Sequence, residues 1–333
     1  MGNLKIPDRR TNTKERTGKN TGDREVNRLT MAIPIIDFRS KNCVEQMHRA
    51  YTTCGFAVFT NVYNEWISEF QDWKQLMEEF FQLPLEVKKK YTYSGVRGSL
   101  TCRAGWGEMG HIQSRPGDMK ESYNWIDSAR MQEQYWPTEI PEFKSSAQQI
   151  LQISQQLSHQ FFDKFESMFK LKKKYLIDRH VNGYVNMRMI HYPAVAYCAV
   201  RGPQTYRGGE HTDYGSITLL WRFDDVGGLQ VEDRETGEWI EAPPVENSIV
   251  LNVADMFQRW SNDTLRSTNH RVINRDHTKS RYTMPYFVDP GRDALIKNFT
   301  DEPDKHSPIS SEDYLQDKLR LNHDEKNWEQ QIN

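Results

Sequence analysis

Apolar residues in the first half of the chain recur at every third or fourth position, with polar residues between them. This period matches the α-helix, so each such stripe predicts a helix that packs one face against a core. Asn42 is a residue type that caps helix N-termini, and Gly55 and Pro84 each stand where a stripe stops. The predicted helices run from Asn42 to Gly55, from Asn64 to just before Pro84, and from Phe143 to Phe169. These stripes explain packing and predict no chemistry.

Beyond Tyr184 the pattern changes to short apolar or alternating segments, which are typical of β-strands. Turn signals such as Gly227-Gly228 and Pro290-Gly291 separate them. Two similar short runs, 33–38 and 56–59, lie in the first half. Closely spaced strands that are separated by such turns are typical of a β-sandwich or β-barrel. The pattern therefore predicts a helical first half packed on a β-rich second half.

The charge of the chain is balanced overall but unevenly distributed. Among its 333 residues, 44 Lys and Arg oppose 46 Asp and Glu, which gives a net charge of -2. Residues 1–30 hold eight basic and four acidic side chains, so this segment is +4 and the remainder is -6. The segment has few apolar residues, so we expect residues 1–30 to be a disordered basic tail. Near-neutrality argues against a general polyanion binder, and we expect no nucleic-acid partner.

Length, hydropathy and cysteine spacing narrow the class of protein further. The length allows two domains, or one large β-rich domain with added helices. No run of about 18 apolar residues occurs, and the first residues lack the apolar stretch of a signal peptide. We therefore expect a cytoplasmic monomer that does not bind membranes. The four cysteines, Cys43, Cys54, Cys102 and Cys198, lie far apart, which favours free thiols over disulfides or a zinc site.

The sharpest candidate for chemistry is a His-x-Asp pair in the run from Glu210 to Gly215. Residues two apart in a strand point to the same face, so His211 and Asp213 can reach one metal ion. Alone, this pair also fits two polar residues near a strand end. His270, at the start of a later strand-like run, adds a second imidazole. Two histidines and one carboxylate make the facial triad that binds Fe(II) and leaves coordination positions open.

A second candidate follows His270, in the run from Ser280 to Phe287. Arg281 and Thr283 share one face of this predicted strand, so a guanidinium and a hydroxyl can bind one carboxylate. Alone, an Arg-x-Thr pair is usually a surface pair. Its position shortly after His270 favours a binding site for an acid beside the metal.

Two aromatic residues are candidates to contact a substrate. Phe287 shares the strand face of Arg281. Trp221 is an even number of residues from His211 and Asp213, so it lies on the same strand face provided that the strand between them is unbroken. Packing in the core is the alternative for both rings.

Together, these residues resemble the isopenicillin N synthase-like branch of the Fe(II)/2-oxoglutarate-dependent oxygenases. That family shares His-x-Asp, a distant His, and Arg-x-Ser or Arg-x-Thr. Further motifs agree in order between about Ile33 and Pro290. They are Ile33 to Phe38, Cys54 to Phe56, Phe80 to Pro84, Lys88 to Tyr91, Lys120 to Tyr123, Tyr192-Pro193, Gly227 to Val231, Leu251 to Asp255 and His270 to Val272. Ordered agreement of this many motifs makes the resemblance specific.

The resemblance implies a mainly β fold with flanking helices, built on a distorted double-stranded β-helix, a cupin-like jelly roll. By the same resemblance, residues 31–180 form the N-terminal helical and mixed region of the oxygenase, and residues 181–295 form the jelly-roll core. Residues 296–333 form a polar C-terminal segment that we expect to be helical.

The resemblance also implies roles for individual residues. The metal ligands are His211, Asp213 and His270, and the residues for the distal carboxylate of 2-oxoglutarate are Arg281, Thr283 and Tyr192. Two positions depart from the family's pattern. Thr283 replaces the commoner Ser, which keeps the hydroxyl and adds a methyl group. Ile190 stands where many plant members carry an Asn, so that contact with the cosubstrate is absent here.

The implied activity couples oxidative decarboxylation of 2-oxoglutarate to succinate with hydroxylation or a related oxidation of a small-molecule metabolite. The implied cofactors are Fe(II), 2-oxoglutarate and O2, with ascorbate as a further reductant in some members. Two alternatives stay open. One is an iron oxidase of the same fold that does not use 2-oxoglutarate, either cyclising or ascorbate-dependent. The other is a non-catalytic binding protein on this fold.

Overall fold

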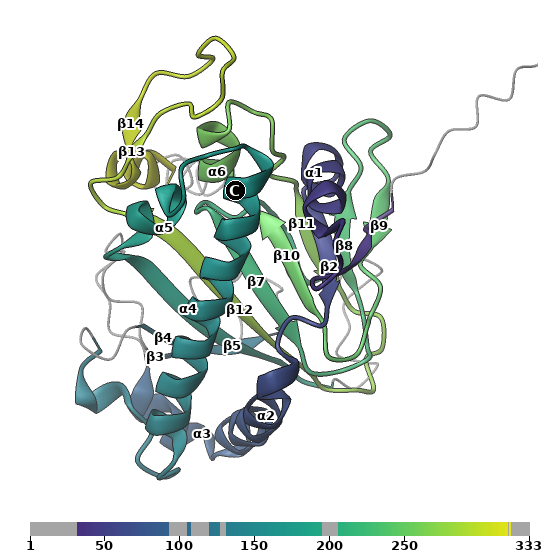
Figure 1. Cartoon of the computed structure of the whole chain (residues 1–333). Coiled ribbons are helices and arrows are strands. Elements are labelled where there is room, and N and C mark those ends of the chain that lie inside the picture. Colours follow the sequence, from purple (N-terminus) through teal and green to yellow (C-terminus); the bar gives the residue numbers. More distant parts are fainter. Residues whose placement is uncertain are drawn as a thin grey trace, which may run out of the picture. The chain divides into compact units, whose positions relative to one another are not determined.

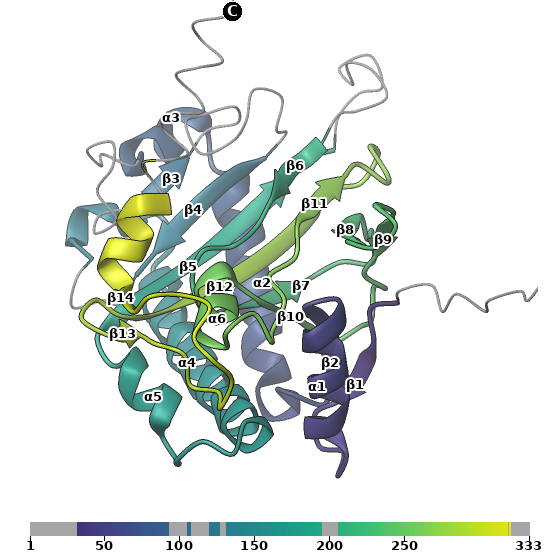
Figure 2. The ribbon, with the colours of Figure 1, turned by 90° about the horizontal axis from the view of Figure 1, so that it is seen from above.

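The computed structural model describes residues 32–92, 105–107, 120–126, 131–194, 206–318 and 320. The predicted basic tail and the residues from 321 onward lie outside this part. The chain from Met31 onward forms one compact unit, and every element below belongs to it. An eight-stranded sheet, the major sheet, and a four-stranded sheet, the minor sheet, make up its centre (Figures 1 and 2).

The two sheets share the strands in an alternating way. The major sheet has the order β1-β2-β10-β7-β12-β5-β4-β3, and the minor sheet has the order β6-β11-β8-β9. The strands are β1 (Ile35–Asp37), β2 (Phe56–Thr60), β3 (Gly105–Gly107), β4 (Glu121–Trp125), β5 (Gly183–Tyr192), β6 (Tyr206–His211), β7 (Ile217–Arg222), β8 (Leu229–Glu232), β9 (Trp239–Glu241), β10 (Ile249–Val253), β11 (His270–Ile273), β12 (Arg281–Gly291), β13 (Leu295–Ile296) and β14 (Ile309–Ser310). From β5 to β12 the chain passes repeatedly from one sheet to the other, which is the winding of the predicted double-stranded β-helix.

Strands from the first half of the chain extend the major sheet at both of its edges. β1 and β2 lie at one edge, and β3 and β4 lie at the other. Only β1 and β2 pair in parallel among the described pairs of this sheet. The region over 31–180 therefore contributes to the same sheet as the core over 181–295.

The predicted helices are confirmed as α1, α2 and α4. The helices are α1 (Cys43–Thr53), α2 (Ile67–Gln82), α3 (Leu85–Lys88), α4 (Phe143–Met168), α5 (Tyr175–His180) and α6 (Asp255–Trp260), with short 3-10 helices at Asn64–Trp66, Lys89–Tyr91 and Glu133–Tyr135. Residues 311–318 form a further helix in the C-terminal segment. Asn42 takes the N-cap position of α1, but its side chain makes no capping hydrogen bond and accepts one from Gln46 Nε2 at 2.6 Å instead.

Strand alternation gives the major sheet one face that packs against helices. This face carries Met187, Met189, Met284 and Tyr286, all of them buried. The indole N–H of Trp73, on α2, points to the sulfur of Met284 at 3.1 Å. In Figure 1 the long helix α4 lies across the same sheet. We call this surface the helix-covered face.

The opposite surface of the major sheet looks toward the minor sheet, and we call it the inter-sheet face. An apolar cluster fills part of the space between the sheets, with Phe56 and Val58 from β2, Val250 from β10, and Leu229 and Val231 from β8. The helix-covered core is larger and holds most of the aromatic rings. Two cores on the two sides of one sheet thus hold the layers together.

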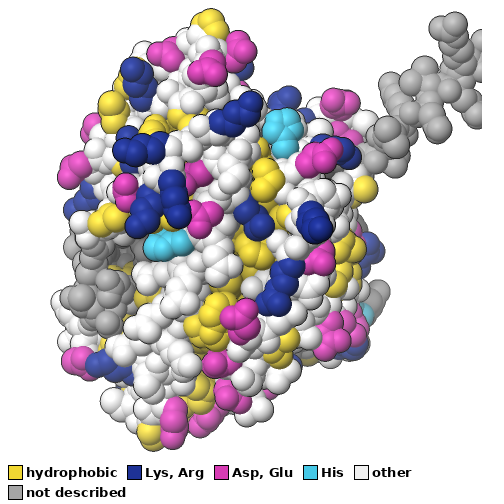
Figure 3. Space-filling model, viewed as in Figure 1, with side chains coloured by type: hydrophobic (Ala, Val, Ile, Leu, Met, Phe, Trp, Pro, Cys, Tyr) yellow, Lys and Arg dark blue, Asp and Glu magenta, His cyan; other side chains and the backbone are white. Residues whose placement is uncertain are grey.

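The described surface carries charges of both signs. Figure 3 shows basic and acidic side chains interspersed over the face seen in Figure 1. Among the described helices, none is long and apolar enough to cross a membrane. Cys43 and Cys54 are buried free thiols, while Cys102 and Cys198 fall outside the described residues.

Candidate active site

The three predicted metal ligands lie together at one end of the minor sheet. His211 ends β6 and His270 begins β11, and the two are direct partners in the antiparallel ladder. Asp213 follows in the segment that connects β6 to β7. One ligand atom from each of the three side chains lies within 4.8 Å of the other two. Strand pairing therefore brings together imidazoles that are far apart in the sequence.

Backbone carbonyls orient both imidazoles. The Nδ1–H of His211 donates to the carbonyl of Gly209 at 2.8 Å. The Nδ1–H of His270 donates to the carbonyl of Thr268 at 3.1 Å. Because a carbonyl only accepts, each ring is held in the tautomer whose Nε2 carries a lone pair. The Nε2 atoms lie 3.9 Å and 4.0 Å from Asp213 Oδ1, so the three atoms converge on one point.

The second carboxylate oxygen of Asp213 is held by two side-chain donors. Thr218 Oγ1 donates to Oδ2 at 2.7 Å, and Asn252 Nδ2 donates to it at 2.8 Å. This arrangement leaves Oδ1 directed toward the histidines. Burial raises the pKa of Asp213, but the two histidines and these hydrogen bonds outweigh burial, so the pKa lies below its ordinary value. The carboxylate is therefore ionised at neutral pH, as metal binding requires.

The His211 imidazole is neutral at neutral pH. Desolvation and the neighbouring imidazole of His270 lower the pKa of His211 below its ordinary value. The His211 side chain is 48% exposed, which limits the contribution of desolvation to this pKa shift. Repulsion from the His270 ring, whose centroid is 4.2 Å away, therefore contributes strongly. The side chain of His270 is only 9% exposed. The triad is thus accessible from the His211 side.

Asp255, the first residue of α6, ties the ligand-bearing segments together. Its N–H donates to the carbonyl of Asp213 at 2.9 Å. Its carboxylate accepts hydrogen bonds from Thr212 Oγ1 at 3.1 Å and from Ser267 Oγ at 2.6 Å. Lys318, from the helix over 311–318, forms an ion pair with the same carboxylate at 2.8 Å. One half-buried acid thereby fixes the backbone on both sides of the triad.

A further carboxyl group, that of Asp289, lies beside the segment that contains Asp213. A Cβ atom added at Gly215 would meet Asp289 Oδ1 at 1.7 Å, so the acid occupies the space over this glycine. Burial, followed by the charge of Asp213, raises the pKa of Asp289 to about 7. Two acids thus share this region, and only Asp213 is ionised well below neutral pH.

Arg281, the first residue of β12, is buried with unused donors. The residue is 1% exposed, and within the described part of the chain its Nε and Nη1 have no hydrogen-bond partner. The nearest carboxylate oxygen, Asp224 Oδ1, is 3.8 Å from Nε. Thr283 lies on the same strand face, and Tyr192 lies directly opposite Arg281 on β5. Because buried unpaired donors are costly, these three residues form a site that an anion would satisfy.

Two arginines that the sequence patterns did not single out flank Arg281. Arg207 is 2% exposed, and its Nη1 has no hydrogen-bond partner among the described residues. Arg222 lies opposite Thr283 on β7. Burial, followed by the charge of Arg281, lowers the pKa of Arg222 to about 10, and the same two causes lower the pKa of Arg207. Mutual repulsion of three guanidinium groups favours an anionic ligand among them.

The two aromatic candidates lie on opposite faces of the major sheet. Phe287 is half-buried on the inter-sheet face, directly opposite Thr218 of β7. Trp221 is 1% exposed on the helix-covered face, where it stacks on Phe70 of α2 with 5.0 Å between ring centroids. The structure corrects the pocket prediction for Trp221 in favour of core packing. The loop at residues 212–216 interrupts the strand, so the alternation of side chains between faces does not continue from His211 to Trp221.

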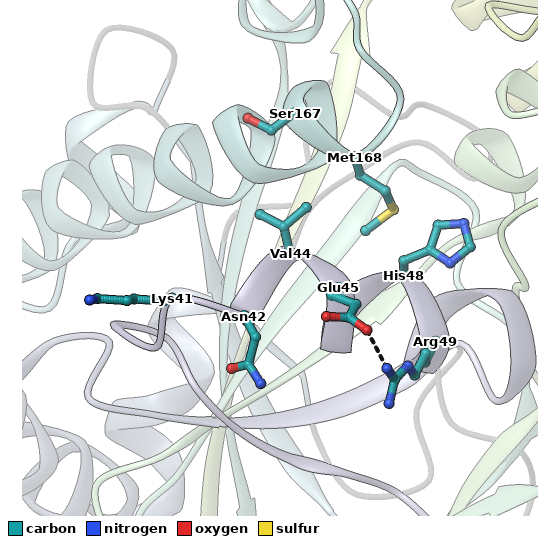
Figure 4. A pocket seen from close by; sticks show the side chains of 8 residues that line it. All are labelled: Lys41, Asn42, Val44, Glu45, His48, Arg49, Ser167 and Met168. Atoms are coloured by element: carbon teal, nitrogen blue, oxygen red, sulfur yellow. Dashed lines mark hydrogen bonds and ion pairs between the residues drawn. The ribbon is translucent and has the colours of Figure 1, made fainter.

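A surface pocket lies apart from this site, between α1 and the C-terminal end of α4 (Figure 4). Its lining residues are Lys41, Asn42, Val44, Glu45, His48, Arg49, Ser167 and Met168. An ion pair between Arg49 and Glu45 spans one turn of α1 at its edge. None of the predicted site residues lines it, so we assign it no part in the chemistry.

Two family models match the chain, one in each half. The model of the 2OG-Fe(II) oxygenase superfamily matches residues 184–290. The model described as non-haem dioxygenase in morphine synthesis N-terminal matches residues 33–143. The first range contains all the predicted metal and cosubstrate residues.

Individual proteins are similar over most or part of the chain. The proline hydroxylase buaE of Petromyces alliaceus is 30% identical over 285 residues, which cover 79% of this chain and 86% of the relative. The 2-oxoglutarate-Fe(II) type oxidoreductase ppzD of Metarhizium rileyi is 33% identical over 218 residues, and the match covers 61% of each chain.

A solved structure is similar over nearly its whole length. A full-length Neurospora crassa protein in complex with alpha-KG has a TM-score of 0.77 at 28% identity, over 89% of this chain and 98% of that chain. Its complex with alpha-KG and thymine has the same TM-score of 0.77 at 27% identity, over 89% and 99% of the two chains.

Proposed function

Because the chain belongs to the 2OG-Fe(II) oxygenase superfamily, we propose that His211, Asp213 and His270 are its iron ligands and that Arg281 anchors the cosubstrate. The protein is a non-haem Fe(II)- and 2-oxoglutarate-dependent dioxygenase that acts on a small molecule. The observation that carries the ligand assignment is the approach of two imidazole nitrogens and one carboxylate oxygen to within 4.8 Å of one another.

The donor set fits Fe(II). Two imidazoles and one carboxylate are the ligands of the facial triad, which leaves positions for other groups. When bound, Fe(II) supplies the chemistry with O2 that decarboxylates 2-oxoglutarate and oxidises the substrate. The chain's own residues hold this ligand set in place. Thr218 and Asn252 direct Asp213, and Asp255 fixes the segments around the triad.

The environment of Arg281 supports its role toward 2-oxoglutarate. The distal carboxylate would accept hydrogen bonds from the buried Nε and Nη1 donors, which have no hydrogen-bond partner among the described residues. Thr283 would add a hydroxyl and Tyr192 a phenol to the same site. We further propose that Arg207 contributes positive charge, since it is buried beside Tyr192 with its guanidinium carbon 5.9 Å from the ring centroid.

On the substrate side, we propose that Phe287 lines the pocket. The ring is half-buried on the inter-sheet face, next to Thr218, which hydrogen-bonds to the proposed ligand Asp213. Relatives are associated with different small molecules, since one is named a proline hydroxylase and another was solved in complex with thymine. A small polar metabolite is the substrate class that these relatives support for this chain.

A titration under anaerobic conditions tests the ligand and cosubstrate assignment. Adding Fe(II) and 2-oxoglutarate to the purified protein should give the weak visible charge-transfer band of the chelated cosubstrate. Asp213→Asn should abolish this band and reduce succinate release to background, because the anionic ligand is lost. Asp317→Asn, an exposed acid that pairs with Arg320, is the matched control and should behave as wild type. A band of normal strength in Asp213→Asn would contradict the assignment.

A further inference from the structure

The inter-sheet face carries a polar cluster that the proposed function leaves unused. Its members are Arg188 and Asn186 on β5 and Asn124 on β4. Asn186 and Arg188 flank the buried Met187, so they share the strand face opposite to the helices. The register pairs Arg188 with Asn124 and Asn186 with Phe287. The cluster therefore lies on the same wall as the proposed pocket residue Phe287.

Arg188 is held in one orientation. Its Nε donates to Asn124 Oδ1 at 2.6 Å, and Asn124 is only 4% exposed. Its guanidinium carbon lies 5.4 Å from the ring centroid of Phe287. A buried amide oxygen and an aromatic face thus position the planar guanidinium. A long side chain fixed in this way loses little further freedom when it binds a ligand.

Asn186 supplies the complementary group. Its Oδ1 is buried, and within the described residues it accepts no hydrogen bond. A buried acceptor without a donor is destabilising unless a ligand supplies an N–H or O–H. Asn186 and Arg188 lie two residues apart on one strand face, or about 7 Å along the strand. A donor and an acceptor are thus presented side by side to a single small molecule.

The cluster borders the metal centre. Phe287 is the cross-strand partner of Asn186 on one side and of Thr218 on the other. Thr218 donates to Asp213, a proposed iron ligand. Neighbouring strands are about 4.8 Å apart, so a molecule that lies on Phe287 is next to the metal-binding end of the sheet.

We propose that Arg188 and Asn186 are specificity-determining residues for a small planar amide or cyclic imide, an inference that rests on the proposed function. Arg188 donates to the substrate carbonyl, Asn186 Oδ1 accepts from the adjacent N–H, and Phe287 packs against the flat face. A simple carboxylate would accept from Arg188 and leave Asn186 Oδ1 unpaired. An apolar substrate would leave Asn186 Oδ1 unpaired as well. The amide or imide group is the one of these three classes that offers a carbonyl to Arg188 and an N–H to Asn186.

Succinate release from the Fe(II)- and 2-oxoglutarate-loaded enzyme tests the substrate class. The probe is a metabolite library in three arms: amides and imides with a free N–H, carboxylic acids without one, and compounds with neither group. The strongest stimulation should come from the first arm, and N-methylation of that compound should reduce it at least tenfold. A best compound from another arm, no active compound in the first arm, or full activity of the N-methyl analogue would each overturn the proposal.

Variants then test the residues. With the best compound of the first arm, Arg188→Met and Asn186→Leu should each raise KM at least tenfold, while the anaerobic charge-transfer titration with 2-oxoglutarate stays unchanged. Arg188→Lys, which keeps the charge, should fold and recover part of the loss. Arg179→Met is the matched control, because Arg179 also lies over an aromatic ring, 3.7 Å from Tyr175, but on α5.

The outcomes distinguish a failure of the specificity assignment from a failure of the proposed iron and cosubstrate residues. Unchanged KM in both Arg188→Met and Asn186→Leu would overturn the specificity assignment. Weakened binding of 2-oxoglutarate in Arg188→Met would place Arg188 at the cosubstrate site, which would also overturn the specificity assignment. Absence of the charge-transfer band in the wild-type protein would instead overturn the proposed iron and cosubstrate residues, and the specificity assignment with them.

Discussion

The two faces of the major sheet are built from the same strands and differ in the side chains that they carry. On the helix-covered face, β5 and β12 present Met187, Met284 and Tyr286, all buried among apolar neighbours. On the inter-sheet face, the neighbouring positions of the same strands present Arg188 and Arg281. The first face is covered by helices and packed with apolar side chains, whereas the second contains guanidinium and amide atoms with no hydrogen-bond partner among the described residues.

This difference shows how one sheet separates stability from chemistry. Burial of apolar side chains on the first face supplies the free energy that unpaired donors on the second face cost. Because successive residues point to opposite faces, neighbouring positions on one strand can serve either purpose. Substitutions on the helix-covered face should therefore alter folding, and substitutions on the inter-sheet face should alter ligand binding.

The largest expected effect is on the helix-covered face. Trp221→Ala should lower the free energy of unfolding by about 3–5 kcal/mol, because it removes a fully buried ring and leaves a cavity. Urea unfolding measures this loss, and the affinity of the folded variant for 2-oxoglutarate should stay unchanged. Trp239→Ala is the control, since that ring is only half-buried and lies under Arg271. An altered affinity with unaltered stability would break the division between the faces.

On the inter-sheet face, Arg281→Lys should weaken 2-oxoglutarate binding by about 100-fold, because lysine cannot reproduce the two-donor fork. The anaerobic charge-transfer titration measures this change, and the free energy of unfolding should fall little. Arg292→Lys, at an exposed pair with Glu312, provides the control. Tight binding of 2-oxoglutarate by Arg281→Lys would show that another residue anchors the cosubstrate.

A smaller effect is expected from Thr218→Val, which keeps the shape and removes one hydrogen bond to Asp213. Iron affinity should fall about tenfold, at the low end for such supporting residues, because Asn252 still holds the same oxygen. Titration with Fe(II) in the presence of saturating 2-oxoglutarate measures it. Thr52→Val, on the exposed side of α1, should leave iron affinity at the wild-type value. Equal affinities of Thr218→Val and wild type would show that Asp213 needs no such support.

The smallest effect concerns pH and Asp289. Its pKa is raised from the ordinary 3.8 to about 7 in the folded protein. Between these values the unfolded chain ionises while the folded one stays protonated, so stability falls as pH rises toward 7. Asp289→Asn should remove this loss and exceed wild type in free energy of unfolding by about 1 kcal/mol at pH 8, a reduced figure because the residue is only partly buried.

Urea unfolding of metal-free Asp289→Asn and wild type at pH 4 and pH 8 measures the difference. The gap should be present at pH 8 and close at pH 4. A gap of equal size at both values would mean that the substitution acts through packing rather than through the loss of an ionisable group.

Patterns along the chain were sufficient to predict the helices and the triad. Helical periodicity directly reflects one buried face, which is why α1, α2 and α4 were predicted near their observed ends. The ligand types of the triad are rare enough in combination to indicate a metal site before any contact is known. Their convergence, however, depends on the pairing of His211 with His270, which spacing alone does not determine.

What the patterns missed depends on register. Arg188, Asn186 and Arg207 are single polar residues in strands, and only the pairing of strands shows which face each one occupies. The prediction for Trp221 failed for the related reason that parity was counted across a loop. Side chains alternate between the two faces only within one continuous strand. Residues can therefore be assigned to the same face by their spacing only when the strand between them is unbroken.

The pairing of His211 with His270 has a practical consequence for handling the enzyme. The separation of the two imidazoles is set by two hydrogen-bonded strands. The protein should therefore keep its fold and its ligand spacing after a chelator has removed the iron. Such a protein can be refilled with a divalent ion that does not react with O2, such as Ni2+. The refilled protein would bind 2-oxoglutarate and substrate in air without consuming either. Libraries of candidate substrates could then be screened by thermal shift and co-crystallisation on the open bench.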